Sequence, residues 1–412
     1  MATVVLLGAL DTKGDEYAFI RDHVLEAGCD VVMINAGVLG DPAYPIDFSR
    51  AVVAAEAGTD IETLVASGDR GTAVTAMAEG ASLLVQRLCR EGRVHGILGM
   101  GGSGSSSIVS HAMRQLPIGF PKLLVSTMAA GDVSAFVGTS DIAMMYSVVD
   151  IAGMNAVSSN ILGNAAAGVA GMAAAYESRV PSSRDTRPLV GATMYGTTTP
   201  CVNTARATLE QLGYEVLVFH ATGTGGRSME ALMKSGYITA SLDVTTTEII
   251  DEIAGGTLTA GPDRLEAAGA LGLPQVVSIG ATDQITFTPP QAVPAEYRGR
   301  NSYDHNPSIT LVRSNAEECA EFGRVVAEKL NRARGPVSVF VPLQGGSSYA
   351  VSGGVFHDPE ADAALVESLR THLDPSVELV DMDADINNPA FAEAMAHRLD
   401  EHYRAWTADR AD

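Results

Sequence analysis

A glycine- and serine-rich stretch, G-M-G-G-S-G-S-S-S at positions 99–107, carries the residues best suited to chemistry in this sequence. It follows a short apolar segment and precedes a helix-forming one, which predicts a strand, a tight turn and a helix start. Glycine leaves no Cβ between backbone and ligand, and the amides of such a turn, together with the helix dipole, favour an anion. A tight turn without a ligand is the structural alternative. The candidate phosphate-binding residues are Gly101, Gly102, Ser103, Gly104, Ser105 and Ser106.

A second polar loop follows the apolar run at residues 3–10. Asp11, Thr12 and Lys13 stand directly after this run, and open α/β sheets place their ligands at the carboxyl ends of strands. A lysine in a strand-to-helix loop can bind phosphate as a point charge. Alternatively, Asp11 or Thr12 caps the helix that follows and Lys13 is solvated.

The second half of the sequence offers another candidate set. The turn A-T-G-T-G-G-R at 221–227 is again glycine-rich and ends on Arg227, which suits a carboxylate or phosphate ligand. Asp283 follows an apolar run, and His305 lies in a polar turn, where a histidine suits acid–base catalysis or metal binding. The structural alternatives are a solvent-facing arginine and a turn histidine bonded to the backbone. We expect Arg227, Asp283 and His305 to be candidate catalytic residues of a second site, for an anionic metabolite in the interdomain cleft.

Composition limits the partners of this protein. The 412 residues include 49 acidic and 27 basic ones, a formal net charge of −22, which disfavours nucleic acid and anionic membranes. The four cysteines form no C-x-x-C pair, which argues against a zinc cluster and a disulfide framework. The first residues lack the basic region of a signal peptide. We therefore expect a cytoplasmic protein with no nucleic-acid or membrane partner.

The order of the segments predicts the fold class. Apolar runs alternate with helical segments, as in parallel sheets covered on both faces. Residues 189–192, L-V-G-A, repeat the pattern of residues 6–9, L-L-G-A, which indicates two similarly built halves. We predict an α/β protein with two Rossmann-like parallel-sheet subdomains. The expected boundaries are 1–180 for the nucleotide-binding domain, 181–188 for a linker rich in Pro, Ser and Arg, and 189–412 for the C-terminal domain.

Seven motifs taken together resemble the ATP-binding family named after the tomato mosaic virus resistance protein, and the resemblance covers nearly the whole chain. The resemblance implies two Rossmann-like subdomains, ATP with magnesium bound by the N-terminal one, and a homodimer. In order along the chain, the motifs are D-T-K-G-D-E (11–16), G-M-G-G-S-G (99–104), V-G-T-S-D-I (137–142), T-M-Y-G-T-T-T-P (193–200), H-A-T-G-T-G-G-R (220–227), H-N-P-S-I-T-L-V-R (305–313) and D-I-N-N-P-A-F-A (385–392).

Carried over position by position, the resemblance assigns the nucleotide to the Asp11–Lys13 loop and the Gly101–Ser106 turn, with Ser126 and Thr127 as further neighbours. No reaction comes with it, so enzymatic activity stays open. The alternatives to an ATP-binding protein that acts on a second small molecule are a non-catalytic nucleotide sensor or partner-binding module, and a nucleotide-sugar-dependent transferase. The last is included because two Rossmann-like halves also describe many glycosyl transferases.

Overall fold

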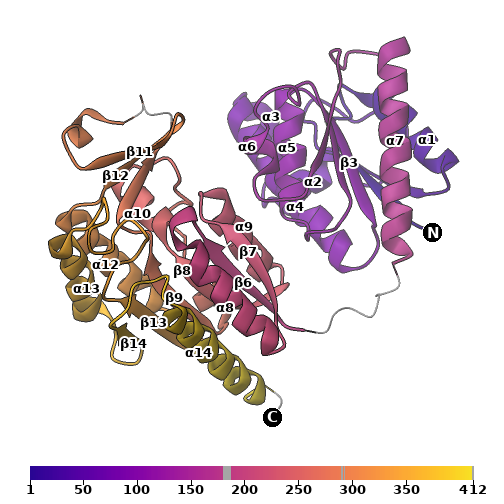
Figure 1. Ribbon diagram of the computed structural model, residues 1–412. Coiled ribbons are helices and arrows are strands. Elements are labelled where there is room, and N and C mark those ends of the chain that lie inside the picture. Colours follow the sequence, from indigo (N-terminus) through magenta and orange to yellow (C-terminus); the bar gives the residue numbers. More distant parts are fainter. Residues whose placement is uncertain (180–186, 289–290, 292, 411–412) are drawn as a thin grey trace. The chain divides into compact units, whose positions relative to one another are not determined.

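The computed structural model describes residues 1–179, 187–288, 291 and 293–410 (Figure 1). The chain divides into two compact units, Met1–Arg184 and Asp185–Asp412. Each unit is described by itself. Of the linker expected at 181–188, residues 181–186 lie outside the described part of the chain.

A five-stranded parallel sheet forms the centre of the N-terminal unit, with strand order β2-β1-β3-β4-β5. The strands are β1 (Thr3–Gly8), β2 (Asp30–Asn35), β3 (Gly96–Gly101), β4 (Lys122–Ser126) and β5 (Ala143–Tyr146). The helices are α1 (Gly14–Glu26), α2 (Arg50–Glu56), α3 (Ile61–Ser67), α4 (Arg70–Arg90), α5 (Ser103–Arg114), α6 (Ser134–Val137) and α7 (Ala156–Glu177).

Helices cover both faces of this sheet, and the sequence of β1 shows why. Val5 and Leu7 pack into the core formed with α2–α5, whereas Val4 and Leu6 pack into the core formed with α1 and α7. Successive side chains of a strand point to opposite faces, so a strand buried on both faces must be apolar throughout. The continuous apolar run of β1 therefore follows from its central position.

The C-terminal unit repeats this strand order around a six-stranded parallel sheet, β7-β6-β8-β9-β13-β14. The strands are β6 (Leu189–Met194), β7 (Glu215–His220), β8 (Ile238–Thr245), β9 (Gln275–Gly280), β13 (Val337–Pro342) and β14 (Glu378–Met382). The helices are α8 (Thr199–Gln211), α9 (Thr224–Lys234), α10 (Thr247–Ala254), α11 (Ala267–Leu271), α12 (Ala316–Leu330), α13 (Pro359–His372) and α14 (Pro389–Ala408), with short 3₁₀ turns at Gly196–Thr198 and Ala295–Tyr297.

A small antiparallel sheet is added to the C-terminal unit. It contains β10 (Gln284–Phe287), β11 (Ser302–Asn306) and β12 (Ile309–Arg313), in the order β10-β12-β11. The prediction of a polar turn around His305 is wrong in this respect, because Ser302–Asn306 pair with β12 as an edge strand whose residues are all exposed. An edge strand that buries neither face carries no apolar alternation, so the pattern resembles a loop.

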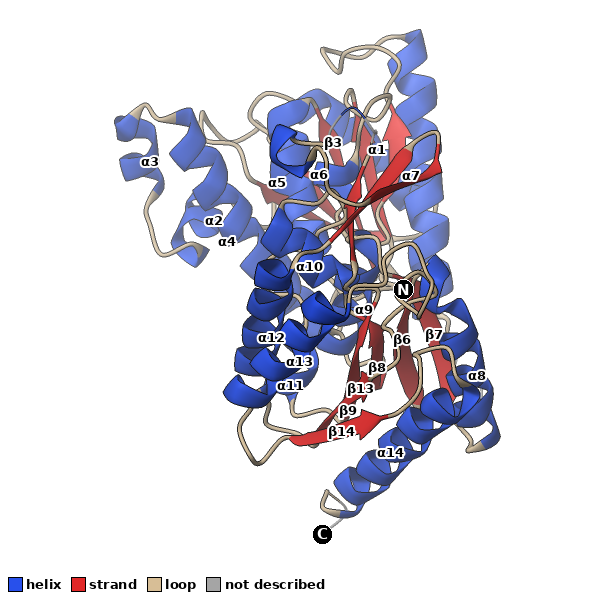
Figure 2. Cartoon of the chain, turned by 60° about the vertical axis from the view of Figure 1, so that its left-hand side comes forward, coloured by secondary structure: helices blue, strands red, loops and turns tan. Residues whose placement is uncertain are grey.

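The two sheets confirm the predicted fold class of two Rossmann-like parallel-sheet units. Figure 2 shows the helices flanking the strands of each unit. No helix in the described part of the chain is long and apolar enough to cross a membrane.

Candidate functional site

A cavity of about 480 Å³ lies at the carboxyl ends of β1 and β2 in the N-terminal unit. The strand order reverses between β1 and β3, and open α/β sheets bind ligands at such a switch point. The cavity brings Asp11 and Thr12, from the loop after β1, together with Gly104 and Ser105, from the start of α5. Four of the residues that the sequence singles out therefore line one cavity.

Tyr17 connects β1 and β3 through its hydroxyl. Its hydroxyl donates a hydrogen bond to the carbonyl of Leu7 (2.6 Å) and accepts one from the amide of Met100 (2.9 Å). A Cβ on Gly8 would lie 1.9 Å from this hydroxyl oxygen, so the position beside Tyr17 has room only for glycine. The phenol therefore joins β1 and β3 near their carboxyl ends.

Asn35 fixes the loops that form one wall of the cavity. Its side chain is fully buried at the end of β2. The amide oxygen accepts hydrogen bonds from the backbone amides of Leu10 (3.1 Å) and Gly37 (2.9 Å), and the amide nitrogen donates to the carbonyl of Gly40 (2.8 Å). The loops after β1 and β2 are thus held by a single side chain.

Asp11 presents an unused acceptor. One carboxylate oxygen accepts a hydrogen bond from the amide of Leu39 (2.8 Å). The other is buried and has no hydrogen-bond partner among the described residues. A Cβ on Gly37 would lie 2.3 Å from the Asp11 carboxyl carbon, so this glycine makes room for the carboxylate. A buried acceptor without a donor is unusual in folded proteins and marks a place for a ligand hydroxyl or amino group.

The glycine-rich turn leaves the start of α5 open. Gly101 has φ of +148°, and a Cβ there would lie 2.5 Å from the Cβ of Ser105. The helix then begins at Ser103 without a side-chain cap. The first amides of a helix lack acceptors inside the helix, and its dipole attracts negative charge. Gly101, Gly102 and Ser103 belong to this turn, although only Gly104 and Ser105 line the cavity.

Arg70 is the functional candidate that the sequence analysis missed. It is exposed at the first position of α4, lines the cavity, and forms no ion pair or hydrogen bond with any described residue. Its terminal nitrogen lies 3.3 Å from where a Cβ on Gly104 would be. A cation is unfavourable in the first turn of a helix. This misplaced charge is the sequence signal that points to a ligand.

The remaining predicted nucleotide-binding residues do not line the cavity. The Lys13 amine donates to the carbonyl of Ile151. The hydroxyls of Ser106 and Ser126 are fully buried and hydrogen-bonded to each other at 2.7 Å. The amide of Thr127 donates to the carbonyl of Gly101 (3.2 Å). In this structure, Ser106, Ser126 and Thr127 join the turn to the end of β4.

The glycine-rich turn at 221–227 already holds an anion that belongs to the protein. Glu248, at the start of α10, accepts hydrogen bonds from the amides of Gly223 (2.7 Å) and Gly226 (3.0 Å) through one oxygen. Its other oxygen accepts from Arg264 (2.7 Å), which also forms a bidentate pair with Asp243 (2.6 and 2.7 Å). We expected an external anion at this turn, but in the structure the turn binds the buried carboxylate of Glu248 instead.

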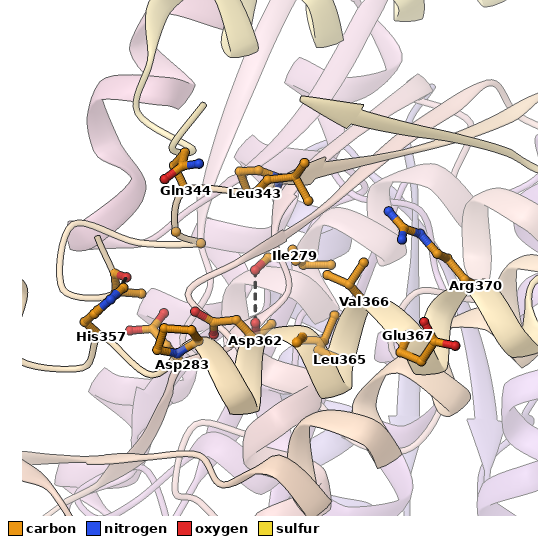
Figure 3. A pocket seen from close by; sticks show the side chains of 17 residues that line it. Ile279, Asp283, Leu343, Gln344, His357, Asp362, Leu365, Val366, Glu367 and Arg370 are labelled. Atoms are coloured by element: carbon orange, nitrogen blue, oxygen red, sulfur yellow. Dashed lines mark hydrogen bonds between the residues drawn. The ribbon is translucent and has the colours of Figure 1, made fainter. Parts of the chain in front are cut away.

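Arg227, Asp283 and His305 do not form one cluster within the C-terminal unit. Arg227 donates to the carbonyl of Gly223 (3.1 Å), and His305 is exposed on β11 with its ring nitrogen 3.3 Å from the Tyr349 hydroxyl. Of the three, only Asp283 lines the cavity of about 350 Å³ found in this unit (Figure 3). Burial raises the pKa of Asp283 to about 6, against the opposing effects of Arg313 and the Ser347 hydroxyl.

Comparisons with known proteins agree on the family. The model described as "Uncharacterised protein family (UPF0261) N-terminal domain" matches residues 2–178, and the one for the C-terminal domain of that family matches residues 187–403. A UPF0261 protein of Clostridium tetani is 47% identical over 397 residues, 96% of this chain and 98% of that protein. The ToMV resistance protein Tm-1 of Solanum lycopersicum is 36% identical over 95% of this chain, which spans 54% of the tomato protein. The resemblance stated from the motifs is confirmed at the level of the family.

Similarity to solved structures is weak. A UDP-N-acetylglucosamine 2-epimerase from Rickettsia bellii matches 67% of this chain and 78% of its own, with 9% identity and a TM-score of 0.24. MurG of Acinetobacter baumannii matches 97% of this chain and 95% of its own, with 12% identity and a TM-score of 0.22. Similarities at this level carry no functional argument for this chain.

Proposed function

This chain belongs to the uncharacterised protein family UPF0261, and we propose that it is a cytoplasmic ATP-binding protein with the nucleotide in its N-terminal unit. The observation that carries the proposal is the cavity at the switch point, where the loop after β1 meets the open start of α5 and the unpaired Arg70. Its volume of about 480 Å³ falls in the usual range for small-molecule sites, roughly 300–1,000 Å³.

The phosphate groups belong at the start of α5. Gly104 allows the backbone to approach a phosphate, Ser105 adds a hydroxyl, and Arg70 adds a positive charge beside Gly104. These local donors act against a formal net charge of −22. Arginine suits this role because its guanidinium can donate two parallel hydrogen bonds to a phosphate.

The nucleoside belongs against the apolar side chains that also line the cavity. Apolar side chains from α3, α4 and α5 offer a surface for a base, and the unpaired oxygen of Asp11 can accept a ribose hydroxyl. Magnesium would arrive with the phosphates and keep several of its waters, since the described residues include no ready-made metal cluster. The apolar residues are Leu64, Val65, Val74, Met77 and Ile108.

The test is calorimetric titration with ATP, ADP, NAD and UDP-N-acetylglucosamine, each with and without magnesium. We expect ATP to bind saturably and the Arg70→Ala variant to bind it at least about tenfold more weakly, because an ionic hydrogen bond is lost. The matched control is Arg90→Ala, which removes an exposed arginine at the other end of the same helix. Equal ATP affinity in the wild type and Arg70→Ala, or no ATP binding at all, would refute the proposal.

A nucleotide sensor is the second candidate function. The cavity is lined by two carboxylates that could act as general bases, Asp11 and Asp69, and both already accept hydrogen bonds from the protein, which supports binding without turnover as the alternative. Phosphate release in the same samples would favour an enzyme, and binding of the nucleotide sugar in place of ATP would favour a transferase. Light scattering of the same preparation tests the homodimer that the family resemblance implies.

A further inference from the structure

The cavity of about 350 Å³ in the C-terminal unit has a polar end and continues past apolar side chains to the charged Glu367 and Arg370. It is bounded by the loops after β9 and β13 and by α13. Figure 3 shows His357, Asp283 and Asp362 close together at one end of the cavity, with Val366 and Leu365 farther along. The Thr282 hydroxyl, which also lines the cavity, donates to the Ile279 carbonyl (3.0 Å) and is therefore occupied.

Asp283 lines this cavity with one carboxylate oxygen that has no hydrogen-bond partner among the described residues. Its side chain is almost fully buried, with 3% of the residue surface exposed. One carboxylate oxygen accepts a hydrogen bond from Ser347 (2.8 Å), and the other has no partner among the described residues. Leaving a buried carboxylate oxygen unpaired is costly. A ligand that donates a hydrogen bond there would remove that cost.

The charges around the cavity select the sign of such a ligand. Arg313 is buried behind it and pairs with Asp362 (2.6 Å), while Arg370 at the outer end pairs with Asp381. Arg313 also acts on Asp283 electrostatically, but its ion pair is with Asp362, and neither Asp283 nor Glu367 forms an ion pair with a described residue. The long-range field of a chain with a net charge of −22 also attracts cations.

We propose that this cavity binds a small organic cation, a primary ammonium group on a short apolar chain, with the ammonium donating to the unpaired oxygen of Asp283. The apolar chain then lies against Leu365 and Val366. The site uses residues of the C-terminal unit alone, so it does not depend on the nucleotide site.

The experiment uses n-butylammonium as the probe and follows it by ligand-observed NMR on the full chain at constant ionic strength. Butyrate and butan-1-ol carry the same apolar chain and serve as control ligands. The variants are Asp283→Asn and, as a matched control, Glu360→Gln, which removes one negative charge from the same unit outside the cavity.

We expect saturable binding of butylammonium at pH 7.5, with a dissociation constant raised about tenfold or more by Asp283→Asn and changed by less than roughly twofold by Glu360→Gln. A wild-type titration adds a test that needs no variant: affinity falls as the pH is lowered from 7.5 to 5 and Asp283 is protonated. The charged groups that accompany Asp283 around the cavity are His357, Asp362, Glu367, Arg313 and Arg370.

Three results would overturn this proposal. They are no saturable binding of butylammonium, equal binding of butyrate or butan-1-ol, and an affinity in Asp283→Asn equal to that of the wild type. If Asp283→Asn does not fold, a wild-type affinity that stays constant between pH 7.5 and 5 is the contrary result.

Discussion

Replacing Tyr17 by phenylalanine tests the reasoning about the switch point. The variant keeps the ring in the core and removes only the hydroxyl that joins Leu7 and Met100. Tyr17 is fully buried, so water cannot replace the lost bonds. Each broken buried hydrogen bond costs about 1–3 kcal/mol when its partner stays unsatisfied.

For the two bonds together we expect a loss of about 3 kcal/mol in the free energy of unfolding of the N-terminal unit. In a domain of 150–250 residues, each kcal/mol lowers the melting temperature by roughly 2–4 °C, so the expected decrease is roughly 6–12 °C. Because the hydroxyl bonds β1 to β3, and the loops that follow these strands carry the proposed nucleotide-binding residues, ATP affinity should fall with stability.

The assay is calorimetric unfolding of the full chain, with Tyr146→Phe as the matched control. Tyr146 lies at the end of β5 in the same unit, is 43% exposed and has no hydrogen-bond partner among the described residues. Its loss of a hydroxyl should change the free energy of unfolding by less than about 0.5 kcal/mol. If Tyr17→Phe unfolds within 2 °C of the wild type, roughly the effect of a single kcal/mol, the hydroxyl does not hold the switch point and the argument fails.

Three further predictions follow from individual contacts. Lys13→Ala should leave ATP affinity within about twofold of the wild type, because the Lys13 amine is hydrogen-bonded to the carbonyl of Ile151. A tenfold loss of affinity would indicate that Lys13 contacts the phosphates instead. Glu248→Gln should destabilise the C-terminal unit by about 3 kcal/mol in chemical denaturation, because an amide NH₂ would face either the glycine amides or Arg264, donor against donor; wild-type stability would contradict this. The pKa of Asp283 is raised to about 6 in the folded state, so its contribution to stability is present at low pH and lost as the pH rises through 6. Asp283→Asn should therefore have a free energy of unfolding about 1–3 kcal/mol above that of the wild type at pH 8. If the difference between variant and wild type is the same at pH 5 as at pH 8, this prediction is wrong.

The sequence predicts the fold class well because that class follows from local patterns. Strands buried on both faces are near-continuous apolar runs, as Val4–Leu7 and Val339–Val341 show, although β13 also buries Ser338. Since the carboxyl ends of parallel strands share one edge of a sheet, the meeting of Asp11 with Gly104 also follows from the pattern. The sequence does not predict the strand Ser302–Asn306, because all of its side chains are exposed and show no apolar pattern.

The contacts that decide the sites come from residues distant in sequence, and patterns do not reveal them. Arg70 reaches Gly104 from the start of another helix. Glu248 fills the turn at Gly223 from 25 residues farther along the chain. No local pattern predicts that the glycine-rich turn before α9 will bind a carboxylate of α10. The position of Arg70 in the first turn of α4, by contrast, can be read from the sequence.

Equivalent positions in the two units differ in a way that bears on the proposed nucleotide site. Gly104 is the second residue of α5, three positions after the end of β3, and Glu248 is the second residue of α10, three positions after the end of β8. Where the N-terminal unit has a glycine beside an open cavity, the C-terminal unit has a buried carboxylate held by Arg264. The hydroxyls of Thr198 and Thr245, bonded at 2.8 Å, join the turn after β6 to the end of β8.

A second nucleotide would therefore meet a buried negative charge, and bringing a phosphate beside it is unfavourable. We expect a single ATP per chain in calorimetric titration, and Glu248→Gln should not create a second site because the side-chain volume remains. A measured stoichiometry of two per chain would show that the carboxylate moves aside for the ligand, and the equivalence of the two positions would then have no functional meaning.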